Sequence, residues 1–271
     1  MKDNSKLIDI GVSFIVSVLS YLMVGPVIYA LLLPYIKGDL MTYASLFIPS
    51  VFTLIVLILI KKKGFFEDFV LLKDKKFSSS LFLIFTLSSF VILSIASLLE
   101  GATVNPARFT AKIISLLISL LFVPIQITIE EYIFRVLPLR VLDRESLGKK
   151  SWCILISIAS GILFTLPHLF NKEVWAEGGE WAVLHYFLWG ALVMAGAIVT
   201  KGFEFPLSMH LSNNLVVSIV ANYKGSSLPS ISFFILENET SSPKAILIFL
   251  LLFAFELLVF CAYKRRRHSE S

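Results

Sequence analysis

The chain has 271 residues, of which 57% are hydrophobic and only 16% are charged. Soluble domains are about 45–50% apolar and about 25% charged, so this composition excludes an ordinary soluble globular protein. The net charge of +5 would suit a nucleic-acid partner in a soluble protein. Here the basic residues lie between apolar runs and in the tail, so we expect membrane lipids as partners and no nucleic acid.

The apolar runs predict an all-α fold, a polytopic bundle of about eight transmembrane helices that forms one membrane domain over residues 1–271. A bilayer with roughly 30 Å of hydrocarbon demands a run of about 20 apolar residues from each helix. The first run is too long for the hydrophobic part of a signal peptide, so we expect it to remain as a helix. The expected spans are about Leu7–Leu33, Tyr43–Ile60, Ser80–Leu99, Ala111–Leu139, Ser151–Phe170, Trp181–Thr200, Phe205–Asn222 and Ala245–Tyr263.

The distribution of basic residues predicts the orientation, because Lys and Arg are enriched in cytosolic loops. With the N-terminus in the cytosol and eight spans, 17 of the 24 Lys and Arg residues fall in cytosolic segments. We therefore expect an integral protein of the cell (plasma) membrane with both termini cytosolic. In the second cytosolic segment, Phe65–Leu72 could be either a short interfacial helix or a plain loop.

The fourth span contains charged residues in a place where most spans have none. Glu130, Glu131 and Arg135 lie within six residues of each other, although one ionised residue at a helix centre costs about 2.5–3.5 kcal/mol. Glu131 and Arg135 are four residues apart and can form an ion pair on one face. Glu130 is turned about 100° from Glu131 and is left without a cation on its own helix to pair with, which suits a general acid or base.

The fifth and seventh spans supply further polar side chains. The fifth ends in His168, directly after Pro167. The proline disturbs the helix and leaves backbone groups without helical hydrogen bonds, which membrane proteins tolerate where the backbone lines a cavity. The seventh begins with His210 and Asn214, which are four residues apart and share a face. A lone histidine at a helix end is usually a packing or interface residue. That is our interpretation of the two other histidines, His185 and His268.

The spacing along the chain predicts that these polar residues meet. Glu130 lies 19 residues before Lys149 and His168 lies 19 after it, so a turn there would place the two side chains at one depth. His210 can join them only if the fourth span extends as far as the turn and residues 201–206 are recessed into the bundle. On these conditions we expect one polar site inside the bundle.

Three motifs, in this order on successive helices, resemble the CPBP family. This family comprises the CAAX prenyl endopeptidases and the bacteriocin-processing or immunity proteins, also called Abi proteins. The motifs are Glu-Glu-x-x-x-Arg at 130–135, Phe-x-x-x-His at 164–168 and His-x-x-x-Asn at 210–214. The resemblance covers about residues 106–222, which we take as the catalytic core. One departure is Val136, where many members carry Gly, so the helix can pack differently there.

The resemblance implies a CAAX-type intramembrane endopeptidase, metallo- or glutamate-dependent, that hydrolyses peptide bonds of a membrane-associated substrate. By motif position, Glu130 would be the base that activates water. His168 and His210 would complete the water or metal site, and Asn214 would be an oxyanion donor or an orienting residue. The ion pair Glu131–Arg135 would support them.

The resemblance and the residue chemistry leave the cofactor open. Glu130, His168 and His210 would make a zinc site with one open position, and the same residues could also work as a metal-free glutamate-type site. Signatures of other intramembrane proteases are missing from the sequence. It contains neither the His-Glu-x-x-His of zincins nor the Gly-x-Ser-x-Gly of serine hydrolases.

Two other functions stay open at the level of the sequence. The chain could be a non-catalytic membrane immunity or regulatory protein that holds a peptide or partner in the same pocket. It could also be a proton-coupled transporter with Glu130 and Glu131 as a relay, although no inverted repeat is recognisable. For a peptidase, the substrate would be a peptide or a prenylated protein. The CAAX branch cuts on the cytosolic side, and a site biased toward that side would favour a substrate from that leaflet.

Overall fold

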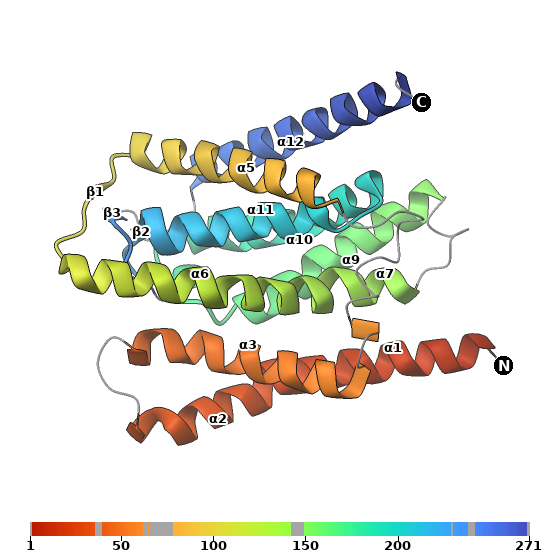
Figure 1. The fold of residues 1–271 in the computed structure, drawn as a ribbon, viewed down its shortest axis with the longest axis horizontal. Helices are drawn as coiled ribbons and strands as arrows, with labels where there is room; N and C mark the ends of the chain where they lie inside the picture. The colour runs from red at the N-terminus through yellow and green to blue at the C-terminus, as the bar shows by residue number, and fades with distance from the viewer. Residues whose placement is uncertain are drawn as a thin grey trace.

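The computed structural model describes residues 2–35, 40–61, 64–65, 78–141, 149–228, 230–237 and 242–269. These residues are mostly helical, and the long helices run back and forth along one direction (Figure 1). The helical elements are α1 (Lys2–Leu19), η1 (Ser20–Val24), α2 (Gly25–Leu32), η2 (Leu33–Tyr35), α3 (Leu40–Lys61), α5 (Ser79–Leu99), α6 (Phe109–Glu131), η3 (Tyr132–Val136), α7 (Leu137–Val141), α9 (Lys150–His168), η4 (Lys172–Val174), α10 (Gly179–Thr200), α11 (Glu204–Leu215), η5 (Val216–Val220) and α12 (Pro243–Ser269).

The prediction of a polytopic helical membrane protein is confirmed. Six helical stretches among the described residues are long and apolar enough to cross a membrane. They are Ile8–Tyr35, Ser79–Leu99, Phe109–Arg140, Lys150–His168, Gly179–Thr200 and Pro243–Tyr263. The remaining two predicted spans correspond to α3, whose apolar part Phe47–Lys61 is shorter, and to α11 with η5. The predicted number of eight is therefore approximate, because α11 has only 12 residues and many of them are polar.

The two ends of the bundle differ in structure. Both chain termini lie at one end, and a small sheet lies at the other (Figure 1). In the sheet, β3 (Phe234–Leu236) pairs antiparallel with β1 (Thr103–Val104) and parallel with β2 (Ala221–Tyr223). We call these ends the termini end and the sheet end. At the termini end, Asp9 of α1 pairs with Lys61 of α3 at 3.2 Å and with Arg140 of α7 at 3.1 Å.

Helices α9 and α10 pack closely because glycines face each other across their contact. A Cβ atom on Gly190 would lie 2.8 Å from the Cα of Gly161 and 2.8 Å from the Cβ of Phe164. The Ser160 hydroxyl, at the same contact, donates to the carbonyl of Phe134 on η3 at 2.9 Å. Small residues commonly allow membrane helices to approach in this way. The contact fixes α9, and with it the end of the helix that carries His168.

Three of the short elements are π-helical, namely η1, η3 and η5. Each continues directly from an α-helix; η1 and η3 insert a wider turn into a longer helix, and η5 ends one. π-Helical turns are rare and often occur at functional sites. Here η3 follows the Glu130–Glu131 pair, and η5 follows the α11 segment that holds His210 and Asn214.

The connection between α10 and α11 bears on one of the two conditions that convergence of the motifs required, namely that residues 201–206 are recessed. Lys201 adopts a left-handed conformation with φ of 55° and ends α10. Lys201 itself is exposed, whereas residues 202–206 are buried. On the other condition, the fourth span continues as a helix to Val141, and residues 142–148 before the predicted turn lie outside the described parts of the chain. Of the earlier predictions, those for segment 66–72 and for the side chain of His268 lie outside the described parts of the chain.

Candidate active site

A cavity of about 440 Å³ inside the bundle brings together the residues that the motifs singled out. Its lining includes Glu130 from α6, His168 from the end of α9, and His210 and Asn214 from α11. Glu130 is 5% exposed and His210 is 4% exposed, so both are effectively buried. Residues that are up to 84 positions apart in sequence therefore line one cavity. All four residues predicted to be catalytic are among its walls.

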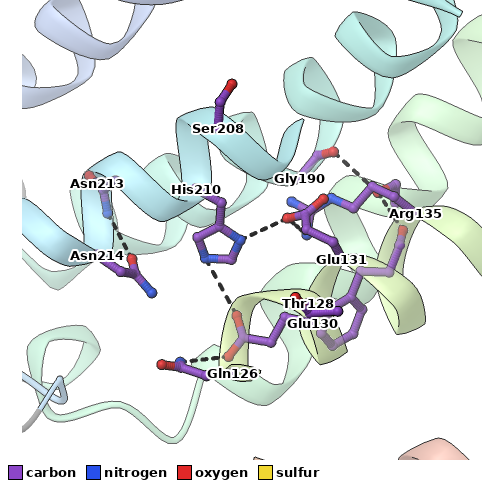
Figure 2. Close-up of polar contacts among 12 residues, drawn as sticks. Gln126, Thr128, Glu130, Glu131, Arg135, Gly190, Ser208, His210, Asn213 and Asn214 are labelled. Carbon is purple, nitrogen blue, oxygen red and sulfur yellow. Dashed lines mark hydrogen bonds and ion pairs between the residues drawn. The ribbon is translucent and has the colours of Figure 1, made fainter. Parts of the chain in front are cut away.

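The two oxygens of Glu130 have different surroundings (Figure 2). Oε1 accepts hydrogen bonds from the Tyr21 hydroxyl and from Gln126 Nε2, each at 2.8 Å. Oε2 lies 3.5 Å from His210 Nε2. Two donors therefore hold one oxygen in place, while the other is directed toward the histidine. Tyr21 belongs to η1, so the N-terminal helices contribute directly to the site.

Glu131 connects the predicted ion pair to His210. Its Oε1 lies 3.1 Å from Arg135 Nη1 and 2.7 Å from His210 Nδ1, and the side chains of Glu131 and Arg135 are fully buried. The Arg135 guanidinium also lies over the ring of Phe164, 4.2 Å from its centroid. A carboxylate can only accept, so Nδ1 of His210 donates to it, and Nε2 is the nitrogen that faces Glu130. The predicted ion pair is present, and it also orients the histidine.

His168 is fixed by its own backbone and by two aromatic rings. Its Nδ1 lies 2.6 Å from the carbonyl oxygen of Phe164. Because a carbonyl only accepts, Nδ1 carries the hydrogen, and in the neutral form of the ring Nε2 presents its lone pair. The ring lies between Phe164 and Tyr186, with centroid separations of 4.4 and 4.3 Å. Its orientation is therefore well defined at the cavity wall.

The structure adds a buried carboxylate that the sequence analysis missed. Glu173, in η4, accepts from the Tyr186 hydroxyl at 2.5 Å, the Ser227 hydroxyl at 2.6 Å and the Tyr223 hydroxyl at 3.2 Å. Burial and the nearby Glu173 raise the pKa of Tyr223. Glu173 thus connects η4, α10 and β2, and it supports the tyrosine that packs on His168. No feature of the sequence identified it, because the residue lies in a loop outside the three motifs.

Of two other residues that the sequence analysis missed, one could have been identified from the sequence and the other could not. Gln126 is four residues before Glu130, so the rule for neighbours on a helix face would have paired them. Tyr21 is 109 residues from Glu130, and no local pattern connects the two. Of the remaining predictions, Val136 is fully buried in η3, and His185 contacts the rings of Trp189 and Phe249.

Asn214 is placed to donate into the cavity. Its Oδ1 accepts from Asn213 Nδ2 at 3.1 Å, which leaves Nδ2 as a donor (Figure 2). The suggested zinc ligands Glu130, His168 and His210 also line the cavity. Among the described residues, however, no group of three or more His, Cys, Asp or Glu side chains is arranged to hold a metal ion. The side chains as arranged thus do not fit the suggested zinc site.

Comparison with protein families connects this site to a known class of enzymes. Residues 109–216 match the family model described as Type II CAAX prenyl endopeptidase Rce1-like. Comparison with curated proteins and with solved structures gave no match. The matched range begins with α6 and extends to the first residue of η5, so it contains all three motifs. The resemblance of this integral membrane protein to the CPBP family of CAAX endopeptidases is therefore confirmed over residues 109–216.

Proposed function

We propose that the chain is an intramembrane endopeptidase that hydrolyses a peptide bond of a membrane-associated substrate with water activated by Glu130. The observation that carries the proposal is the asymmetric setting of this carboxylate. Tyr21 and Gln126 hold Oε1, while Oε2 faces His210 in the cavity that His168 also lines. The match to a protease family over the same helices supports this chemistry.

The proposed reaction uses the side chains as follows. Oε2 of Glu130 removes a proton from a water molecule, whose oxygen attacks the carbonyl carbon of the peptide bond. The lone pair of His168 Nε2 accepts a hydrogen bond from the same water. Asn214 Nδ2 donates to the tetrahedral oxyanion and stabilises it, while Glu131 holds His210 beside Glu130. Glu130 then delivers its proton to the leaving nitrogen as the C–N bond breaks.

The finer assignments are part of the same proposal. The substrate is a CAAX-type or bacteriocin-related peptide, and the protein resides in the plasma membrane with its termini in the cytosol. The excess of Lys and Arg in the segments on the side of the termini supports this orientation.

The test compares new peptide termini in host membranes that contain wild type, Glu130→Gln or the matched control Glu180→Gln at equal levels. Glu180 is exposed in the first turn of α10 and does not line the cavity. General acid–base groups typically contribute about 10²–10⁴-fold to a rate. We therefore expect termini formed by wild type and Glu180→Gln to fall at least about 100-fold with Glu130→Gln. Identical termini in all three samples would reject catalysis and favour an immunity or regulatory protein.

A further inference from the structure

We infer that the candidate site is reached from the sheet end of the bundle, that this end faces away from the cytosol, and that the substrate is a membrane-anchored peptide presented on the extracytoplasmic side. The direction of access rests on the cavity and on the charge distribution alone. Only the identification of the occupant as a substrate rests on the proposed peptidase function.

The cavity extends from the buried Glu130 toward the sheet end. Tyr223 of β2 and Leu236 of β3 line it, as do Ser227 and Leu228 from the chain between these strands. All four of these residues are partly exposed. The cavity thus connects the buried carboxylate with the surface around the sheet.

Among the described residues, those that line the cavity avoid the termini end on every helix that reaches it. On α10, which runs toward the termini end, the last lining residue is Trp189. On α11, which runs back, the first lining residue is His210, and the described residues of α7 contribute none. Several apolar side chains in the helix segments nearer the termini end are fully buried and do not line the cavity. These include Ile133, Val136, Leu137, Phe203 and Phe205.

The cavity also reaches the side of the bundle. Leu22 of η1 and Pro26 of α2 line it, and both are exposed. They lie in the second half of the span Ile8–Tyr35, which is the half toward the sheet end (Figure 1). On α9, the lining residues Phe164, Pro167 and His168 lie at the same end. A peptide held in the leaflet on that side can therefore reach the site without leaving the membrane.

Charge distribution indicates which side this is. The segments that join helices at the termini end, together with the two tails, carry 17 of the 24 Lys and Arg residues. Such an excess is typical of the cytosolic side. The sheet end is then extracytoplasmic, opposite to the cytosolic bias that the sequence analysis considered. Of the two substrate classes proposed above, a CAAX-type peptide in the cytosol would face the end of the bundle opposite the cavity mouth, so the inference selects a peptide on the extracytoplasmic side.

Cysteine accessibility in intact cells tests the direction of access without any need for catalysis. In a Cys153→Ala, Cys261→Ala background, single cysteines replace Val217 in the cavity, Leu228 at its mouth and Lys150 at the termini end. Leu117→Cys is the control, since Leu117 is 60% exposed on α6 and does not line the cavity. The probe is a small, charged, membrane-impermeant thiosulfonate.

We expect the cysteines at positions 217 and 228 to react in intact cells, and the cysteine at position 150 to react only after permeabilisation. The Leu117→Cys control should not react in either condition. The inference would be overturned if only the cysteine at position 150 reacted in intact cells. It would also be overturned if the cysteine at position 217 did not react with probe added outside intact cells. Adding Glu130→Gln should leave this pattern unchanged, so a wrong direction of access can be told apart from a wrong function.

The peptide termini that Glu130→Gln abolishes provide the second readout. If the inference is right, they map to segments of membrane-anchored proteins on the extracytoplasmic side. Termini that map to cytosolic segments would contradict the inference and would leave the proposed peptidase function standing.

Discussion

At the scale of single residues, the environment of Glu130 depends on donors from two different parts of the chain. Tyr21→Phe removes one of the two hydrogen bonds to Oε1 and keeps the ring. A hydrogen bond to a charged group contributes about 1.5–3 kcal/mol. If the bond is needed to hold the carboxylate for catalysis, kcat/KM should fall about 10- to 100-fold. Steady-state kinetics measure this change. Tyr29→Phe, on the same span but outside the cavity, should leave kcat/KM unchanged.

The Glu131–Arg135 pair is expected to matter for stability more than for the chemistry. Both side chains are fully buried, so Arg135→Ala removes the arginine partner of a buried carboxylate and leaves it the hydrogen bond from His210. Breaking a buried pair in this way costs about 3–5 kcal/mol. Thermal unfolding in detergent should show a clear loss for Arg135→Ala. A smaller loss is expected when Glu131→Ala is added, and an unchanged Tm for Arg135→Ala would contradict this role.

Sequence could predict the contacts of this site only where they are local. Glu131 and Arg135 are one helical turn apart, and the structure has them paired at 3.1 Å. The bond from His210 to Glu131 joins positions 79 residues apart, and its formation depends on the packing of α11 against α6. Helical periodicity contains no information about such packing, which is why the sequence identified both residues but not their bond.

At the scale of helices, the close contact of α9 with α10 controls where His168 lies. In Gly190→Ala, the new Cβ would approach Gly161 Cα, Phe164 Cβ and the Ser160 carbonyl oxygen, each at 2.8 Å. Overpacking of this kind costs about 1–3 kcal/mol. We expect lower stability, measured by thermal unfolding, and lower cleavage because α9 shifts.

Gly11→Ala is the matched control for this substitution. A Cβ on Gly11 would meet nothing within 4 Å, and the residue lies in the interior of α1. Alanine is favoured over glycine in a helix by roughly 0.5–1 kcal/mol. This control should be neutral or slightly stabilising, and an equal loss in both variants would reject the explanation by packing.

Long apolar helices were the most predictable elements. Six of the expected spans meet the criteria of length and composition in the structure. The seventh was less accurately predicted, because α11 is short and polar and continues as η5 before it ends in β2. Its polar residues are tolerated because they face the buried site and neighbouring backbone. The Ser212 hydroxyl, for example, lies 2.9 Å from the Thr86 carbonyl. Hydropathy alone cannot distinguish such a helix from a loop.

At the scale of the whole molecule, α12 is attached to the bundle by a buried carboxylate. Glu256 is fully buried, and its Oε1 accepts from the hydroxyls of Ser88 and Ser89 on α5 at 2.7 and 2.8 Å. Glu256→Ala leaves both hydroxyls without this acceptor, at a cost of about 1–3 kcal/mol for a buried group. We expect a lower Tm in detergent. Glu256→Gln keeps an acceptor oxygen and should restore most of the loss, whereas equal Tm values for both variants would exclude this attachment.

The three π-helical turns have a consequence for how the chain tolerates change in its length. A π turn closes i→i+5 hydrogen bonds and so holds one residue more than an α turn. That residue rotates everything after it by about 100° around the helix axis. Deleting one residue within η3 would return this helix to a regular α-helix and turn α7 away from its neighbours. At η1, η3 and η5, we therefore expect conservative substitutions to be tolerated more readily than insertion or deletion of a single residue.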